Sequence, residues 1–432
     1  MGNRRPQPAD RRQPPRERSP APGRLATGRA DIPVVRRCLG VDRQRLPPLP
    51  GLQAATGQPR RVQRQVHVRA DGSARWLLRH PAGAYPRHLS QLLLPGHALA
   101  IRRAAPGQGG LSVPLSIRFH DQRSQNAEHS LRETVLAGFA ERPKATPPKL
   151  FYDRRGSELF EQICRQPEYY PTRTEELILA RAARDIAGIA GRDASLVELG
   201  SGASRKVRLL LEAMHPASYL GIDISEDFLC ASTQRLADDY PWLEVHAACA
   251  DFSRPMSLPD GFAGEHPLAF FPGSSIGNFD PREAQAFLAN LHELLPAKGG
   301  LLIGVDLVKD RSVLEAAYND RAGVTAAFNL NLLERIRREL DSDIEPDSFV
   351  HRAFFNQADS RIEMHLVSSR AQDVTIEGER FHFAAGESLH TENSYKYSAE
   401  DFHALADGAG FRALAMWTDP LALFSVHYLQ RE

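Results

Sequence analysis

A buried strand that runs into a glycine turn, with an acidic residue at a set distance beyond it, constrains the fold of this chain most. Leu196-Val197-Glu198-Leu199 is apolar enough for a buried strand, and Gly200-Ser201-Gly202 follows it directly. Asp223 ends a second apolar run, 21 residues after Gly202. In a doubly wound α/β sheet, the glycines let the backbone approach a nucleoside ligand, and the acid accepts hydrogen bonds from the ribose hydroxyls. The spacing therefore predicts such a sheet with a nucleoside ligand.

The turn itself narrows the choice of ligand. It reads Gly-x-Gly without the third spaced glycine of the dinucleotide fingerprint, and Glu198 lies just before it. These departures favour S-adenosylmethionine over NAD, with the backbone N–H groups of Gly200 and Gly202 meeting the methionine part of the ligand. An ordinary strand-to-helix turn is the alternative, and Asp223 argues against it. Lys206 is a candidate ion-pair partner for the ligand's carboxylate; alternatively, it is a solvated lysine.

Strands and helices alternate through the middle of the chain. The expected strands cover 196–199, 219–223, 243–248, 268–272 and 300–306, and the expected helices about 204–214, 226–238 and 281–295. Strands separated by helices predict a parallel sheet. A helix over 399–409 and strands over 412–417 and 423–429 are expected to complete the sheet with an antiparallel hairpin.

Two segments, 120–174 and 310–395, do not follow this alternation. In the first, Ser157 is expected to cap a helix, and the proline-bounded stretch 167–173 is expected to be a loop before a helix from Thr174 to about Ile189. The second contains a helical stretch over about 325–341 and strand-like runs over 350–356, 361–368 and 373–384. We expect both segments to join as a substrate-binding cap. Residues 175–309 and 396–432 then form the cofactor-binding domain.

Two polar stretches follow strands of the predicted sheet. Asp251 and Phe252 come after the third strand, where an aspartate can accept a hydrogen bond from an adenine amino group and the Phe252 ring can pack on the base. Asn278 ends a glycine-rich loop after the fourth strand. Ligands of open α/β sheets bind beyond the carboxyl ends of the strands, so Asn278 is a candidate partner for a substrate carboxylate or amine. A turn role is the alternative for Asp251 and Asn278.

Residues 1–110 differ from the rest of the chain in composition. They contain about 21 arginines, no lysine and about 5 acidic residues, whereas the whole chain has a net charge of +1. The remaining chain is therefore acidic, which argues against nucleic acid as a partner of the main body. A disordered basic tail or a transit peptide would have this composition. We favour a third interpretation: a GC-rich gene read in the wrong frame, with the true start between about 105 and 130.

Cysteine usage and hydropathy bear on the cellular compartment. Cys38, Cys164, Cys230 and Cys249 form no close CxxC pair, so neither a zinc site nor a disulfide framework is expected. No apolar run reaches the roughly 18 residues of a membrane span, and the N-terminus lacks the apolar segment of a secretory signal. We expect a cytoplasmic monomer that binds neither a metal ion nor a membrane.

Several motifs, in order along the chain, together resemble one enzyme family. They are Phe151-Tyr152-Asp153, Pro167-Glu168-Tyr169-Tyr170-Pro171-Thr172-Arg173, Glu198-Leu199-Gly200-Ser201-Gly202, Gly273-Ser274-Ser275-Ile276-Gly277-Asn278, Gly304-Val305-Asp306-Leu307-Val308-Lys309-Asp310 and Thr391-Glu392-Asn393-Ser394. Over about 120–432 the chain resembles the histidine Nα-methyltransferases of ergothioneine biosynthesis. The resemblance implies a Rossmann-like class I methyltransferase sheet with a smaller α+β cap. It also implies transfer of three methyl groups from S-adenosylmethionine to the α-amine of L-histidine, which gives hercynine.

The resemblance also assigns roles to single residues. Tyr152 matches a tyrosine that hydrogen-bonds the substrate amine, and Asn278 and Tyr318 match residues that hold its carboxylate; Tyr152 and Asn278 are the expected catalytic residues. The expected imidazole pocket comprises Tyr169, Glu392 and Ser394, with Met364 beside it. The expected cofactor site comprises Gly200, Lys206, Asp223, Asp251 and Phe252. Taken singly, the three tyrosines would be packing residues, Met364 a core residue and Glu392 a surface acid.

Three other functions remain open at this point. A methyltransferase for another amino acid, such as tryptophan or prenylated tryptophan, would share the fold, but the Glu392 and Ser394 pair argues against an indole pocket. A non-catalytic S-adenosylmethionine-binding regulator would bind the cofactor without turnover. A nucleic-acid-binding module would depend on residues 1–110 alone and would bind in a salt-sensitive way.

Overall fold

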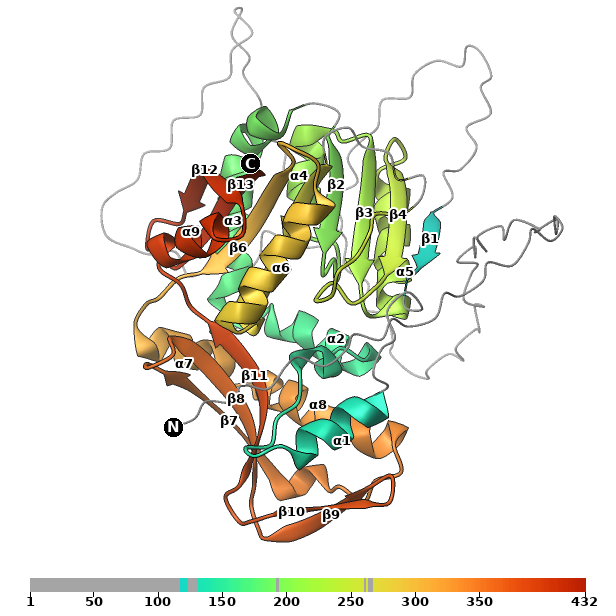
Figure 1. Ribbon diagram of the computed structural model, residues 1–432, viewed down its shortest axis with the longest axis vertical. Helices are drawn as coiled ribbons and strands as arrows, with labels where there is room; N and C mark the ends of the chain where they lie inside the picture. The colour runs from blue at the N-terminus through green and yellow to red at the C-terminus, as the bar shows by residue number, and fades with distance from the viewer. Residues whose placement is uncertain (1–116, 123–130, 192–193, 260–261, 263–266) are drawn as a thin grey trace, which may run out of the picture. The chain divides into compact units, whose positions relative to one another are not determined.

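One large sheet forms the framework of the molecule. A computed structural model describes residues 117–122, 131–191, 194–259, 262 and 267–432, so the segment 1–110 lies outside the described residues. The sheet has eight strands in the order β1-β4-β3-β2-β5-β6-β13-β12 (Figure 1). The pairs from β1 to β6 are parallel, and β13 is antiparallel to both β6 and β12. The predicted fold class and the closing antiparallel hairpin are confirmed.

The strands of this sheet coincide closely with the predicted runs, apart from β1, which the sequence analysis missed. Their bounds are β1 (Arg118–Asp121), β2 (Ser195–Leu199), β3 (Ser218–Asp223), β4 (Glu244–Cys249), β5 (Pro267–Phe271), β6 (Gly300–Asp306), β12 (Phe411–Thr418) and β13 (Phe424–Arg431). The chain adds β3 and then β4 on one side of β2, and it then crosses to add β5 and β6 on the other side. The strand order therefore reverses between the neighbouring strands β2 and β5. Such a switch point opens a crevice beyond the carboxyl ends of the strands.

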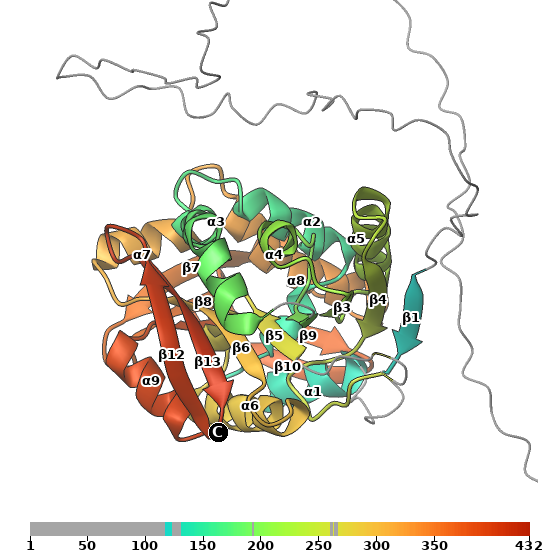
Figure 2. The ribbon, with the colours of Figure 1, turned by 90° about the horizontal axis from the view of Figure 1, so that it is seen from above.

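Helices cover both faces of the large sheet (Figure 2). On one face lie α3 (Tyr170–Ala190), α4 (Val207–Met214) and α5 (Glu226–Asp239), and on the other lie α6 (Pro281–Leu294) and α9 (Ala399–Asp407). Alternate residues of a strand point to opposite faces. Thus Phe270 packs with the α3 side and Phe271 with the α6 side, and both are fully buried.

A smaller α+β part lies beyond one end of the large sheet (Figure 1). It contains an antiparallel three-stranded sheet of order β11-β8-β7 and a two-stranded hairpin of β9 and β10. Its elements are α1 (Leu131–Ala140), η2 (Pro148–Phe151), α2 (Arg154–Ile163), α7 (Arg311–Tyr318), α8 (Val324–Glu339), η4 (Pro346–Ser348), β7 (Phe349–Asn356), β8 (Arg361–Ser368), β9 (Gln372–Ile376), β10 (Glu379–Phe383) and β11 (Ser388–Tyr395). One hydrophobic cluster combines residues 135–170 with residues 314–389.

Three local predictions are wrong. Helix α2 begins at Arg154, because the Asp153 side chain caps it by accepting the N–H of Gly156, and Ser157 is buried inside the helix. Helix α3 begins at Tyr170 within the predicted loop, since a proline in the first helical turn loses no helical hydrogen bond. The predicted strand 373–384 is a hairpin that turns at Glu377 and Gly378, both with positive φ.

Strand β11, which the sequence analysis also missed, contains a bulge. His390 pairs with His365 and Glu392 with Met364, so Thr391 is the extra residue. Simple alternation would place Glu392 on the same face as His390. Because of the bulge, Glu392 lies on the face of Met364, which is buried in the hydrophobic cluster of the smaller part.

Candidate active site

A cavity of about 590 Å³ lies beyond the carboxyl ends of β2, β3 and β4 and of neighbouring β5. Residues of both the large sheet and the smaller part line it. Of the predicted site residues, those that line it are Tyr152, Tyr169, Gly200, Lys206, Asp223, Asp251, Phe252 and Asn278. The cavity therefore combines the whole predicted cofactor set with part of the predicted acceptor set.

The glycine turn and Asp223 hold each other in place. Gly200 and Gly202 both have positive φ, a conformation that glycine adopts without the penalty of a Cβ. Asp223 accepts hydrogen bonds from the backbone N–H of Gly202 at 2.9 Å and of Ser225 at 3.0 Å. Burial raises the pKa of Asp223 from its ordinary value, although these N–H donors act in the other direction. The two halves of the sequence signature thus form one hydrogen-bonded unit.

Glu198, at the end of β2, forms a buried pair with Tyr219 of β3. The Tyr219 hydroxyl donates to the Glu198 carboxylate at 2.6 Å. Glu198 is 1% exposed, and burial raises its pKa to about 8. The sequence did not reveal Tyr219 as its partner, because the two residues are on different strands.

Lys206 makes an ion pair beside the cavity with a residue that the sequence analysis missed. Its Nζ lies 2.6 Å from the carboxylate of Glu175, which is fully buried. Glu175 also accepts the backbone N–H of Gly273, at 2.9 Å to one oxygen and 3.1 Å to the other. The position of Glu175 on the apolar face of α3, with Ile178, Leu179 and Ala182, is the signal that could have identified it. Glu175 therefore connects the cofactor turn to the loop after β5.

Asp251, which follows β4, is ion-paired as well. Asp251 accepts from Lys149 Nζ at 2.7 Å and from the Ser253 backbone N–H at 3.0 Å, and these contacts lower its pKa although burial opposes them. Lys149 comes from η2 and was not predicted. Phe252 packs against Phe271, with ring centroids 5.5 Å apart.

Two side chains that line the cavity have polar groups free to meet a ligand. The Tyr152 hydroxyl and the Asn278 amide line the cavity and form no hydrogen bond with any residue in the described part of the chain. Tyr169 lies beside them, and its ring meets that of Tyr318 edge to face at 6.3 Å. Burial raises the pKa values of Tyr152 and Tyr169 well above the ordinary value, so both hydroxyls keep their protons.

The remaining predicted residues are not among those that line the cavity, although Tyr318 meets Tyr169, which does. They are Tyr318, Met364, Glu392 and Ser394. The Glu392 carboxylate forms no hydrogen bond within the described ranges, and burial raises its pKa to about 7. Its charge contributes to the raised pKa of both Tyr152 and Tyr169, which places it near them. A carboxylate without a partner in the described part of the chain is therefore held close to the two cavity tyrosines.

A buried network surrounds Asp306 at the end of β6. Asp306 accepts from the Tyr170 hydroxyl at 2.7 Å, Lys309 at 2.5 Å and Lys396 at 2.8 Å. Lys396 also donates to Ser394 Oγ at 2.7 Å and to Tyr318 Oη at 3.2 Å. The lysine charges lower the pKa of Asp306, against the effect of burial. Lys396 was missed, although Glu392, Ser394 and Lys396 follow the period of two that places side chains on one strand face.

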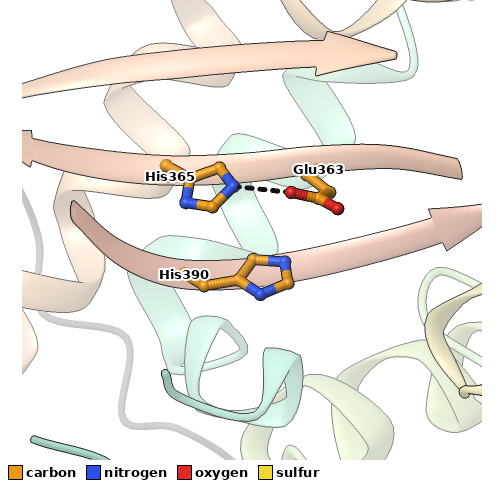
Figure 3. Close-up of side chains that lie close together, drawn as sticks. All are labelled: Glu363, His365 and His390. Atoms are coloured by element: carbon orange, nitrogen blue, oxygen red, sulfur yellow. Dashed lines mark hydrogen bonds and ion pairs between the residues drawn. The ribbon is translucent and has the colours of Figure 1, made fainter. Parts of the chain in front are cut away.

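A cluster of Glu363, His365 and His390 lies outside the cavity, on β8 and β11 (Figure 3). Their ligand atoms lie within 4.8 Å of one another. However, the two imidazole rings are stacked only 14° from parallel, so their in-plane lone pairs do not converge. Glu363 is already paired with Arg361 at 2.7 Å and accepts from His365 at 3.0 Å. The three side chains therefore form an ion-paired stack, and we assign no metal ion to them.

The fold and the cavity define an S-adenosylmethionine-dependent methyltransferase, and comparison with known proteins gives the family. A family model described as "Histidine-specific methyltransferase, SAM-dependent" matches residues 131–431. The chain belongs to this family. None of the helices in the described ranges has the length and apolar character to cross a membrane.

Three relatives illustrate the similarity. The histidine N-alpha-methyltransferase of Mycolicibacterium smegmatis is 43% identical over 310 residues, covering 70% of this chain and 95% of that protein. The protein of the same name from Mycobacterium tuberculosis is 40% identical over 315 residues, with coverages of 70% and 95%. Ergothioneine biosynthesis protein 1 of Neurospora crassa is 30% identical over 310 residues, covering 69% of this chain and 35% of that protein.

Proposed function

We propose that this enzyme transfers three methyl groups in succession from S-adenosylmethionine to the α-amino group of L-histidine, giving hercynine in ergothioneine biosynthesis. The names of the relatives support this acceptor and this pathway. The observation that carries the proposal is the Glu392 carboxylate, which lies near Tyr152 and Tyr169 and has no hydrogen-bond partner among the described residues. A free carboxylate there suits an acceptor whose side chain has an N–H group.

Glu392 and Ser394 are the proposed readers of the imidazole ring. They lie two residues apart on one strand face, so their Cα atoms are roughly 7 Å apart. An imidazole that forms a hydrogen bond of about 2.8 Å at each nitrogen spans a similar distance. A residue without ring nitrogens would leave both groups unpaired, which costs on the order of a few kcal/mol. Met364, opposite Glu392 in the register, would pack beside the ring.

The proposed cofactor site is the turn with its neighbours. Two positive-φ glycines next to an acid at the switch point fit S-adenosylmethionine, which supplies the methyl group when bound. Asp223 would accept from the ribose hydroxyls and Asp251 from the adenine amine, with Phe252 against the base. Lys206 would meet the ligand's carboxylate, and Glu175 fixes the position of Lys206.

Tyr152 and Asn278 are the proposed groups that orient the reacting amine. Only a neutral amine has a lone pair for the methyl group, and a free α-amine has a pKa of about 8 or higher, so the site must hold the deprotonated form. Both side chains have free polar groups in the cavity, and Tyr318 would hold the acceptor's carboxylate. Correct placement at about 3 Å supplies much of the acceleration. The tyrosine rings also suit the increasingly cationic product through cation–π attraction.

The domain boundaries and the cellular setting are also proposals. We infer that residues 120–174 and 310–395 form the substrate-binding cap, because one hydrophobic cluster combines residues from both segments. Residues 120 and 121 belong to β1 of the large sheet, so the lower bound of the cap moves from residue 120 to a point after Asp121. We further infer a cytoplasmic monomer.

A competition assay with free amino acids tests the acceptor. The protein is incubated with S-adenosylmethionine and an equimolar mixture of histidine, tryptophan and other amino acids, and the products are identified by mass. We expect histidine with one, then two, then three added methyl groups. Preferred methylation of tryptophan would overturn the acceptor assignment. Cofactor binding without any turnover would instead identify a regulator.

A further inference from the structure

The oxygen of Ser394 accepts two hydrogen bonds inside the protein. The Tyr318 hydroxyl donates to Ser394 Oγ at 2.7 Å, and Lys396 Nζ donates to it at 2.7 Å. A hydroxyl oxygen has two acceptor lone pairs and one proton. Both lone pairs of Ser394 are therefore occupied, and no residue in the described ranges accepts its proton. Ser394 can thus only donate to a ligand.

Lys396 determines the direction of the hydrogen bonds at Ser394. An ammonium group has three N–H donors and no acceptor. The three oxygens it meets are those of Asp306 at 2.8 Å, Ser394 at 2.7 Å and Tyr318 at 3.2 Å. Lys396 is 3% exposed, so water does not compete for these donors. A hydroxyl that faces a buried ammonium group must present its oxygen to it.

We propose that Lys396 is a specificity-determining positioning residue. Because Lys396 donates to the Ser394 oxygen, the Ser394 proton is left to donate to the unprotonated ring nitrogen of the substrate. This inference rests on the proposed function. Glu392 accepts from the protonated nitrogen of the same ring. The pair therefore selects a neutral imidazole, with one acceptor and one donor at fixed positions. An imidazolium ring has no lone pair for Ser394 and is disfavoured.

The charge of Lys396 has a second effect at the same site. It is the cation whose attraction opposes the burial of the Glu392 carboxylate. Lys396 thus favours the accepting form of Glu392 and the donating form of Ser394 together. Its neighbour Lys309 shares Asp306 but touches Tyr170 and the Leu307 carbonyl instead of Ser394. Replacement of Lys309 therefore removes a positive charge next to Asp306 without removing a hydrogen bond to Ser394, which makes it the matched control for replacement of Lys396.

A double-mutant cycle on KM for histidine tests the proposal. Lys396→Met and Ser394→Ala are each expected to raise KM roughly tenfold, the effect of losing one charge-assisted hydrogen bond. The double variant is expected to resemble the single variants, because Lys396 acts through Ser394. Lys309→Met should combine additively with Ser394→Ala. The Kd of S-adenosylmethionine, measured by calorimetry, should stay within about twofold of the wild-type value in all variants that fold.

Each outcome is decisive. Additive effects of Lys396→Met and Ser394→Ala, or an equal coupling with Lys309→Met, would overturn the role of Lys396. If Lys396→Met does not fold, Lys396→Arg replaces it. The same coupling is expected, because a planar guanidinium does not direct its donors at these three oxygens, and wild-type KM in that variant would also overturn the proposal. If the wild-type protein does not methylate histidine, the proposed function itself has failed.

Discussion

At the scale of single residues, Glu392 combines its proposed role at the acceptor site with a cost in stability. Burial raises its pKa from the ordinary 4.5 to about 7, so the folded state binds this proton more tightly than the unfolded state. The resulting stabilisation is complete below about pH 4.5 and is lost as the pH rises through 7. An ionised Glu392 at pH 8 therefore lowers the free energy of unfolding by about 3 kcal/mol.

The variant Glu392→Gln should separate these two effects. We expect it to be more stable than the wild type at pH 8, with a difference that shrinks toward pH 5. Its kcat/KM for histidine should fall at least roughly tenfold, because the charge-assisted hydrogen bond to the ring is lost. Urea unfolding at several pH values and steady-state kinetics measure the two quantities. A stability difference that does not change with pH would contradict the assignment of this titration.

Asp223 is the residue on which cofactor affinity should depend most. Replacement by alanine removes the acceptor of the Gly202 and Ser225 N–H groups and of the proposed ribose contact. We expect Asp223→Ala to weaken S-adenosylmethionine binding at least roughly tenfold in calorimetry. Asp227, an exposed acid in the first turn of α5 that does not line the cavity, provides the control, and Asp227→Ala should bind normally. Equal affinity in both variants would remove Asp223 from the cofactor site.

Residues whose role depends on a neighbour in sequence could be predicted, and those that depend on a neighbour in space could not. Gly200, Gly202 and Asp223 belong to a spaced pattern with a known mechanical reason. The partners of Glu175 and Lys396 could not be predicted, because they are 31 and 90 residues away along the chain. The hydrogen-bond direction at Ser394 became visible only with both of its donors in place.

At the scale of secondary structure, the bulge at Thr391 determines which face of β11 carries the proposed imidazole pocket. The Thr391 hydroxyl contacts Asn329 Oδ1 at 2.8 Å and the Met364 carbonyl at 3.0 Å. Asn329 is fully buried on α8, so its oxygen has no access to water. These contacts fix the extra residue between β8 and α8.

Thr391→Val should weaken the bulge without changing side-chain volume. We expect a loss of about 1–2 kcal/mol in the free energy of unfolding, because buried acceptors are left unpaired. KM for histidine should rise several-fold, whereas the Kd of S-adenosylmethionine should not change. Thr146→Val is the matched control, since that buried hydroxyl forms no hydrogen bond in the described ranges, and its stability should remain close to that of the wild type. Equal losses in both variants would contradict a specific role for Thr391.

Regular elements were predictable where one periodicity governs them. The parallel strands alternate with helices because both faces of the sheet are buried. In β11, an inserted residue reverses the alternation, and in the β9–β10 hairpin two positive-φ residues interrupt a continuous strand-like run. Neither the bulge nor the turn changes the pattern of polar and apolar residues enough to be predicted from the sequence. Strand β11 was missed for this reason.

At the scale of the whole molecule, the site requires elements from two parts of the chain. The sheet contributes the carboxyl ends of its strands. The proposed acceptor residues Tyr152 and Glu392 come from segments inserted between β1 and β2 and between β6 and β12. The loop η3 (Ser275–Asn278) meets β11 closely, because a Cβ at Gly277 would lie 2.7 Å from the Tyr395 carbonyl oxygen. This contact places Asn278 of the sheet part next to the strand that bears Glu392.

All described elements, and every residue that lines the cavity, lie at Arg118 or beyond. A protein that begins at Leu111 retains β1 and the complete cavity, and it loses a segment with about 21 arginines. We expect this variant to match the full chain within about twofold in kcat, in KM for histidine and in cofactor affinity, because no proposed contact involves the removed residues. Its isoelectric point should fall well below 7.8, the value of the full chain. Loss of histidine methylation in the shortened protein, with cofactor binding retained, would instead assign residues 1–110 a role at the acceptor site.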